Sequence, residues 1–317
     1  MWAQMATRRL SFLFVRSYCS EGPQSSVRFD DERVQNYISL LNGRDFNKVF
    51  SLRKGEASLP KFKLMNREMV KKAYFDTMKR CEERLKPPPV VEQRKDLGEE
   101  ISTDPKLKDF DDSKWVFTDI SMGIEDKDRY IVVREPSGTL RQATAFERDR
   151  LCQTYMPAPG RKIWLPTLLT KEELPYALKR VNVLHILDLV CAQCPPDSPD
   201  YIRVQETAYE YVRSQGLYSE LYSTKHYGGL IWYLVQKDKL LGLIGFLVSK
   251  EKLGDVEILV KLYCLVHPDT ATESIQELTG EEMVKSFCEH KGYLTILDSL
   301  SKENDSSSEP VTATDTV

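Results

Sequence analysis

Two cysteines three residues apart, Cys191 and Cys194, form the most suggestive chemical pair in the sequence. Such a pair binds zinc when two further Cys or His ligands follow at suitable spacing, and exchanges disulfides when it lies between a strand and a helix. Here a predicted helix precedes the pair, Pro195-Pro196 follows it, and no second CxxC and no HxxxH occurs. We therefore interpret both thiols as residues at a helix end and predict no metal site and no cofactor.

Other residue patterns associated with catalysis are equally incomplete. His267-Pro268-Asp269 matches the tripeptide that J-domain co-chaperones place between two helices, but only Lys261 lies near it where a basic helix is needed. A proline that ends a helix, followed by a capping Asp, explains the tripeptide better. His185 and His226 are single, and neither a lysine-containing phosphate loop nor a serine nucleophile elbow is present. We predict that the chain is not an enzyme, has no catalytic residue and takes no small-molecule substrate.

A basic helix is the strongest candidate for function. Asn66 is a suitable N-cap and Pro87-Pro88-Pro89 ends the helix. At about 100° per residue, one face is apolar (Val70, Ala73, Tyr74, Met78, Cys81 and Leu85), and another is basic with one aromatic. Lysine and arginine neutralise phosphates, and an aromatic ring can stack on an unpaired base. The alternative is an ordinary solvated face. The predicted RNA-binding residues here are Arg67, Lys71, Lys72, Phe75 and Lys79.

A second group of cations lies later in the chain, around a predicted β meander. Its members are Arg134, Arg141, Arg148, Arg150, Arg161 and Lys162. No domain signature of a sequence-specific RNA reader accompanies either group, which favours contacts to the RNA backbone within a larger assembly.

The net charge of -3 conceals blocks of opposite sign. Residues 44–95 contain 15 Lys and Arg against 7 Asp and Glu, whereas residues 96–135 contain 6 against 12. Residues 136–180 contain 8 against 4, and residues 181–300 contain 10 against 17. Such blocks indicate that different stretches face different partners: RNA for the basic ones, proteins for the acidic C-terminal half.

Hydrophobic periodicity predicts an α+β fold that is predominantly α, with stacked helical hairpins and a small antiparallel β meander. Helices are expected at 31–42, 66–86, from 144, and at 171–179, 182–193, 198–214, 217–236, 239–250, 254–266 and 272–291. Strands are expected at 115–120, 130–134 and 139–143. Capping boxes are expected at Thr144 and Thr170, and residues 90–113 are expected to be linker. The predicted regions are a cleaved presequence (1–20), a helical basic N-terminal arm (21–95), an acidic linker with the meander (96–143), a helical domain (144–300) and a disordered acidic tail (301–317).

The first twenty residues have the composition of a mitochondrial transit peptide. They contain Arg8, Arg9 and Arg16 and no acid, with large apolar residues between the cations. We place the cleavage near Tyr18; the alternative is a disordered cytosolic N-terminus. The longest apolar stretch, residues 240–248, is far short of the roughly 20 residues of a membrane span. Seven scattered cysteines indicate reduced thiols inside a cell compartment.

Several blocks closely resemble the family of mitochondrial small-subunit ribosomal protein S22, over about residues 30–295. The most specific lie between 115 and 163, and the segment after His267 resembles the family less well. The blocks are Trp115–Ile120, Tyr130–Arg141, Glu147–Arg150, Gly160–Ile163, Pro87–Val90, Pro196–Ser198, Tyr201-Ile202, Tyr227–Gly229, Trp232-Tyr233 and Leu265–Asp269.

This resemblance implies a mitochondrion-specific structural protein of the small subunit of the mitochondrial ribosome, located in the matrix and without catalysis. It also implies contacts to small-subunit ribosomal RNA and to neighbouring mitochondrial ribosomal proteins. Two other hypotheses stay open at this point: a mitochondrial helical-repeat adaptor that binds RNA or protein outside the ribosome, and an enzyme with an unrecognised site.

Overall fold

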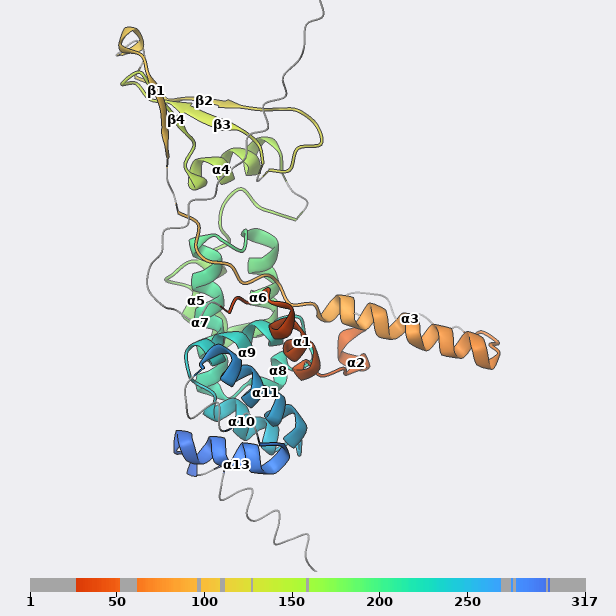
Figure 1. Ribbon diagram of the computed structural model, residues 1–317. Helices are drawn as coiled ribbons and strands as arrows, with labels where there is room; N and C mark the ends of the chain where they lie inside the picture. Colours follow the sequence, from red (N-terminus) through yellow and green to blue (C-terminus); the bar gives the residue numbers. More distant parts are fainter. Residues whose placement is uncertain are drawn as a thin grey trace, which may run out of the picture.

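Three groups of elements make up the structure: a body of short helices, a small β sheet with one helix beneath it, and one long helix that projects sideways (Figure 1). The computed structural model describes residues 27–51, 62–95, 98–108, 112–126, 128–157, 160–268, 275, 278–294 and 296. The predicted presequence and the predicted acidic tail lie outside these residues. The predominantly helical α+β class predicted from the sequence is confirmed.

The body is built from short helices that pack against helices close to them in sequence, either adjacent or next but one. Helix α6 packs on α7, α10 on α11, and α11 on α13, as expected for stacked hairpins. Helix α1 (Glu32–Leu41) comes first in the chain and packs on α9 and α11 of this body through its buried Val34, Ile38 and Leu41. The helices of the body are α5 (Leu174–Arg180), α6 (Val183–Gln193), α7 (Pro199–Gln215), α8 (Tyr218–Leu221), α9 (Tyr227–Gln236), α10 (Leu241–Val248), α11 (Leu253–Val266) and α13 (Gly280–Lys291).

The sheet is antiparallel, with strand order β1-β4-β3-β2. The predicted meander is present as β2 (Trp115–Thr118), β3 (Ile131–Arg134) and β4 (Thr139–Gln142). The prediction that residues 90–113 are linker was wrong in part, because β1 (Glu100–Thr103) pairs with β4. All four residues of β1 are exposed, so no alternation of apolar and polar side chains marked it as a strand.

Helix α4 (Ala145–Tyr155) follows the sheet and lies against one of its faces (Figure 1). The predicted capping box is confirmed: the Thr144 hydroxyl accepts from the Glu147 N–H, and the Glu147 carboxylate accepts from the Thr144 N–H. The second predicted box was wrong. The Thr170 hydroxyl donates to the Thr167 carbonyl at 2.7 Å instead, and α5 begins only at Leu174, with Pro175 in its first turn.

The predicted helix at 217–236 is divided into α8 and α9. Between them Ser223 has a φ of 62°, outside the helical region. Its buried hydroxyl accepts a hydrogen bond from the Asp45 N–H at 2.8 Å and donates to the Gly43 carbonyl. The break therefore depends on a contact with the segment after α1, which local sequence does not reveal.

Candidate RNA interface

Helix α3 (Arg67–Leu85) forms for local reasons that the sequence makes visible. The Asn66 side chain caps its N-terminus by accepting from the Met69 N–H at 2.8 Å. Lys86 leaves the helical conformation at the C-terminus, where the following proline disfavours further helix. The predicted helix is therefore confirmed almost to the residue.

The C-terminal end of α3 is firmly attached to the rest of the protein. Cys81 and Leu85 are its two buried residues, next to the short helix α2 (Phe46–Val49). The Arg84 guanidinium lies 4.8 Å from the centre of the Phe50 ring and donates to the Val49 carbonyl at 3.1 Å. The buried Asn42 amide donates to the carbonyl of Leu85 at 3.1 Å. These contacts fix the C-terminal end of α3, while the rest of the helix projects from the body.

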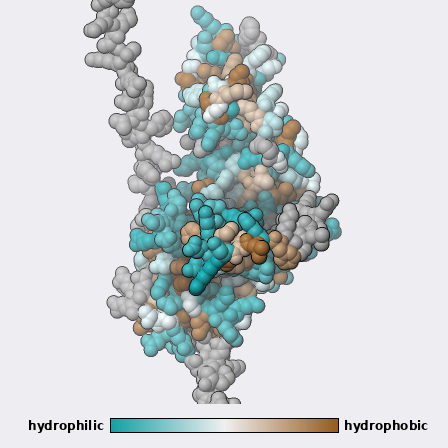
Figure 2. Space-filling model, turned by 90° about the vertical axis from the view of Figure 1, so that its right-hand side faces the viewer, coloured by the Kyte–Doolittle hydropathy of each residue, from teal (hydrophilic) through white to brown (hydrophobic). Residues whose placement is uncertain are grey.

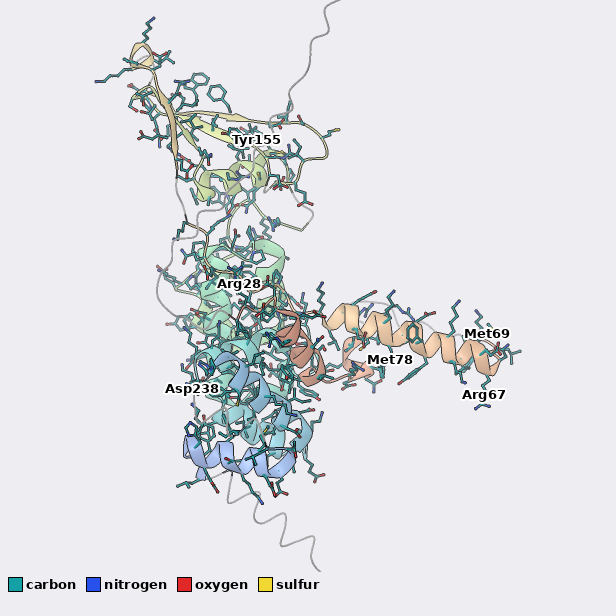
Figure 3. All side chains as sticks on the ribbon, in the orientation of Figure 1. Arg28, Arg67, Met69, Met78, Tyr155 and Asp238 are labelled. Atoms are coloured by element: carbon teal, nitrogen blue, oxygen red, sulfur yellow. The ribbon has the colours of Figure 1, made fainter. Side chains whose placement is uncertain are left out.

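The projecting part of α3 presents all the RNA-binding residues predicted there. We call the projecting helix α3 (Arg67–Leu85) the arm; Figure 3 shows Arg67 and Met69 at its outer end and Met78 nearer the body. Within the described part of the chain, no carboxylate forms an ion pair with the four cations. The exposed predicted residues are Arg67, Lys71, Lys72, Phe75 and Lys79.

The arm is amphipathic, yet its apolar side is also uncovered. Figure 2, which looks at the arm from its tip, shows hydrophilic atoms gathered on one side and hydrophobic atoms on the other. On the apolar face Val70 is 53% and Tyr74 62% exposed, and Phe75, within the basic face, is 69% exposed. Exposed apolar residues at this density mark an interaction site.

The four strands and α4 together form a unit that we call the sheet unit. Arg141, from the second predicted group, lies inside it. Its guanidinium donates to the Glu135 carboxylate at 2.6 Å and to both oxygens of the Glu147 carboxylate at 2.8 Å. The arginine therefore joins β4 to the start of α4 and to the β3–β4 turn. Its charge is already neutralised, so the structure gives it an internal role.

The hydrogen bonds from Arg141 hold the pKa of Glu147 at about 2, well below its usual value. A depressed carboxyl pKa stabilises the fold above the unfolded pKa of about 4.5, and this contribution is lost as the pH falls toward 2. We expect acidification from pH 5 to pH 2 to reduce the unfolding free energy of the sheet unit by about 1–2 kcal/mol through this carboxyl, allowing for solvent screening. Amide exchange of β4 and α4 against pH measures it.

The control is Glu147→Gln, which keeps an acceptor at the capping position but cannot titrate. It should be less stable at pH 7 and show a flatter dependence below pH 5. An unchanged pH profile in this variant would assign the acid sensitivity to other carboxyls.

Two further members of the second group, Arg148 and Arg161, face a common cleft of about 370 Å³ between the sheet unit and the body. Arg148 donates to the Asp126 carbonyl at 2.9 Å, and Arg161 to the Ala192 carbonyl at 3.1 Å. Arg94, which the sequence did not single out, pairs with Asp149 in the same cleft. Arg94, which pairs with Asp149 of α4 and Asp197 of the body, and Arg161 join the two parts of the molecule, whereas Arg148 bonds within the sheet and α4.

The other three members lie apart from the cleft or at its margin. Arg134 is half-buried and donates to the Gly138 carbonyl at 3.3 Å, whereas the Lys162 side chain is exposed. Arg150 is exposed and its guanidinium lies 4.2 Å from the centre of the Trp164 ring. Trp164, itself 66% exposed, was missed. An aromatic beside cations was the signal used for Phe75, and it applied here too.

Of the thiols and histidines considered for chemistry, Cys194 and His226 are buried in the body, Cys191 and His267 are partly buried, and His185 is exposed. Burial raises the pKa of Cys194 to about 11, so the thiol is protonated at neutral pH. His267 donates from Nε2 to the Val235 carbonyl at 2.9 Å, and His226 contacts Asp188 at 3.0 Å. Among the described residues, no three His, Cys, Asp or Glu side chains are grouped to hold a metal ion. None of the described helices is long and apolar enough to cross a membrane.

Comparison with known proteins places these features in a family. The sequence model of the family described as "Mitochondrial 28S ribosomal protein S22" matches residues 27–268. The chain belongs to this family. Among its relatives is the Bos taurus "Small ribosomal subunit protein mS22", 37% identical over 280 residues, which are 86% of this chain and 78% of the relative. The protein of the same name from Mus musculus is 37% identical over 274 residues, 84% and 76% of the two chains.

Membership of the S22 family confirms the family predicted from the sequence. The matched region includes the whole of α3, the sheet and the body through α11, and it stops at Pro268. The arm is therefore part of the family's common region.

Proposed function

We propose that this chain is a non-catalytic constituent of the small subunit of the mitochondrial ribosome, and that the α3 arm is its main contact with ribosomal RNA. As a mitochondrial ribosomal protein it works in the matrix, with ribosomal RNA and other ribosomal proteins as partners. The finer assignment rests on one observation: a rigidly based helix projects from the body with its predicted cations exposed and without ion pairs among described residues.

The arm is suited to an RNA groove or loop. Its lysines lie on one side of a helix that extends away from the acidic body, so phosphates can approach them with little repulsion. Phe75 lies among them and is free to stack on an unpaired base. Arg150 with Trp164, and Lys162, supply a second, smaller contact near the sheet unit.

The acidic body, by contrast, is suited to protein neighbours. Residues 181–300 contain 17 acids against 10 bases, which repels RNA and attracts the basic surfaces common among RNA-binding proteins. The body helices thus form the protein-facing part of the molecule.

Sucrose-gradient sedimentation of matrix extract, with and without RNase, tests the proposal. We expect the chain to co-migrate with the small subunit and to leave that position when the RNA is digested. Migration only in light fractions would reject the ribosomal assignment in favour of an adaptor outside the ribosome.

A further inference from the structure

Strand β2 is an edge of the sheet that lies open to a partner. Trp115 is 54%, Val116 43% and Phe117 51% exposed. The opposite edge, β1, contains an irregularity in register between Glu100 and Ser102. Irregular edges resist pairing with another chain, whereas a regular apolar edge invites it. The two edges of this sheet therefore differ, and β2 is the edge suited to pairing with an added strand.

The register of β2 determines which backbone groups are available. The Asp119 N–H donates to the Tyr130 carbonyl at 3.2 Å, which makes residues 119 and 130 a hydrogen-bonded pair. Such pairs alternate along an antiparallel ladder, so Phe117 and Trp115 bond to β3. Val116 and Thr118 direct their N–H and C=O groups away from the sheet. No described residue bonds to these groups.

Side chains at this edge also favour a bound strand. Ile131 and Val133 are buried and pair directly with Thr118 and Val116, so these four side chains share one face of the sheet. Because successive side chains of a strand point to opposite faces, Trp115 and Phe117 lie on the face opposite Ile131 and Val133. An added strand could lay alternate apolar side chains beside these two rings.

The charge around β2 argues for protein rather than RNA. Residues 111–130 contain six acids and three bases, a balance that repels phosphate. We infer that β2 receives an extended segment of a neighbouring ribosomal protein as a fifth strand, with apolar residues over Trp115 and Phe117 and basic residues at its ends. This inference rests on the proposed function, because the neighbour exists only if the chain is in the small subunit.

Val116→Pro is the sharpest test. Proline removes an N–H that bonds to no described residue of the sheet, and an edge position tolerates it. Val116→Ala is the matched control, since it loses the side chain and keeps the N–H. Both variants should fold, with the β3 and β4 amides protected as in the wild type. In the assembled small subunit, only the Pro variant should leave the Thr118 amide unprotected.

Amide exchange of residues 112–119 provides the measurement, in the free chain and in purified small subunits. For the wild type and Val116→Ala we expect Thr118 to exchange on the order of 100-fold more slowly in the subunit. This protection should survive RNase treatment of subunits whose proteins were first cross-linked to one another, so that the chain stays with its protein neighbours when the RNA is removed. Fast exchange at Thr118 in a chain that co-sediments with the intact subunit would overturn the strand addition and leave the proposed function intact. Protection that RNase abolishes in the cross-linked subunits would mean that RNA covers the edge. Absence from the subunit would defeat the proposed function itself.

Discussion

Reversing the charge of Lys71, Lys72 and Lys79 to glutamate is expected to weaken binding of the chain to small-subunit ribosomal RNA roughly 100-fold at low salt, at about 1 kcal/mol per lost contact. Each lysine that neutralises a phosphate releases counterions, so the slope of log affinity against log salt should fall by about 2 to 3. Binding of purified chain to the RNA at several salt concentrations measures both quantities. The same variant should be depleted from small subunits on a gradient.

Two comparison variants give this result its meaning. Phe75→Ala should weaken binding by about 1–3 kcal/mol without altering the salt slope, because stacking releases no counterions. The matched control reverses three other exposed lysines that lack ion pairs with described residues and lie outside both predicted groups. This control variant should bind RNA almost normally. An equal loss of RNA affinity in both triple variants would show that the arm lysines contribute only nonspecific charge. The control lysines are Lys171, Lys179 and Lys250.

Elements whose causes are local could be predicted from the sequence. Helix α3 has an Asn cap at one end and prolines at the other, and α4 has a complete capping box at Thr144. The three strands of the meander could be predicted because β-branched and aromatic residues lie between turn residues. In each case the information sits within a few residues of the element.

Elements that depend on distant contacts could not be predicted. Strand β1 exists because β4 offers it a partner, and its own residues are all exposed. The break between α8 and α9 exists because Ser223 bonds to residues near Asp45. At Thr170 the local pattern misled, because Pro175 favours the first turn of a helix and moves the start of α5 downstream.

The candidate site residues differ in the same way: some could be predicted from local sequence and others depend on distant contacts. The arm residues follow one helix, so their common exposure could be inferred from spacing. The second group was collected by proximity in sequence, and the fold separates it: Arg141 neutralises Glu135 and Glu147, Arg148 and Arg161 line a cleft, and only Arg150 and Lys162 are exposed. Whether an arginine is free or paired depends on which carboxylates the fold brings near it, and sequence spacing does not determine that.

The attachment of the arm to the body depends on a close approach at Gly228. A Cβ placed there would lie 2.5 Å from Cγ2 of the buried Ile38 in α1 and 3.3 Å from Cβ of Pro87, just after α3. Neither neighbour can move freely, since Ile38 is fixed in the core and Pro87 follows the arm. Gly228→Ala should therefore destabilise the chain by about 1–3 kcal/mol, in spite of the roughly 1 kcal/mol that alanine gains over glycine in a helix. Urea unfolding measures this loss.

Gly245→Ala is the matched control, because Gly245 also lies in a helix but a Cβ there meets nothing within 4 Å. That variant should be as stable as the wild type or up to about 1 kcal/mol more stable. The location of the damage is the more informative result: Gly228→Ala should raise amide exchange in α1 and at the base of α3 before it affects α6 and α7. Because the overlap acts on Ile38 and Pro87, this variant should also bind RNA less well although every arm cation is intact. Normal RNA binding by a destabilised Gly228→Ala chain would show that the arm acts independently of its attachment to the body.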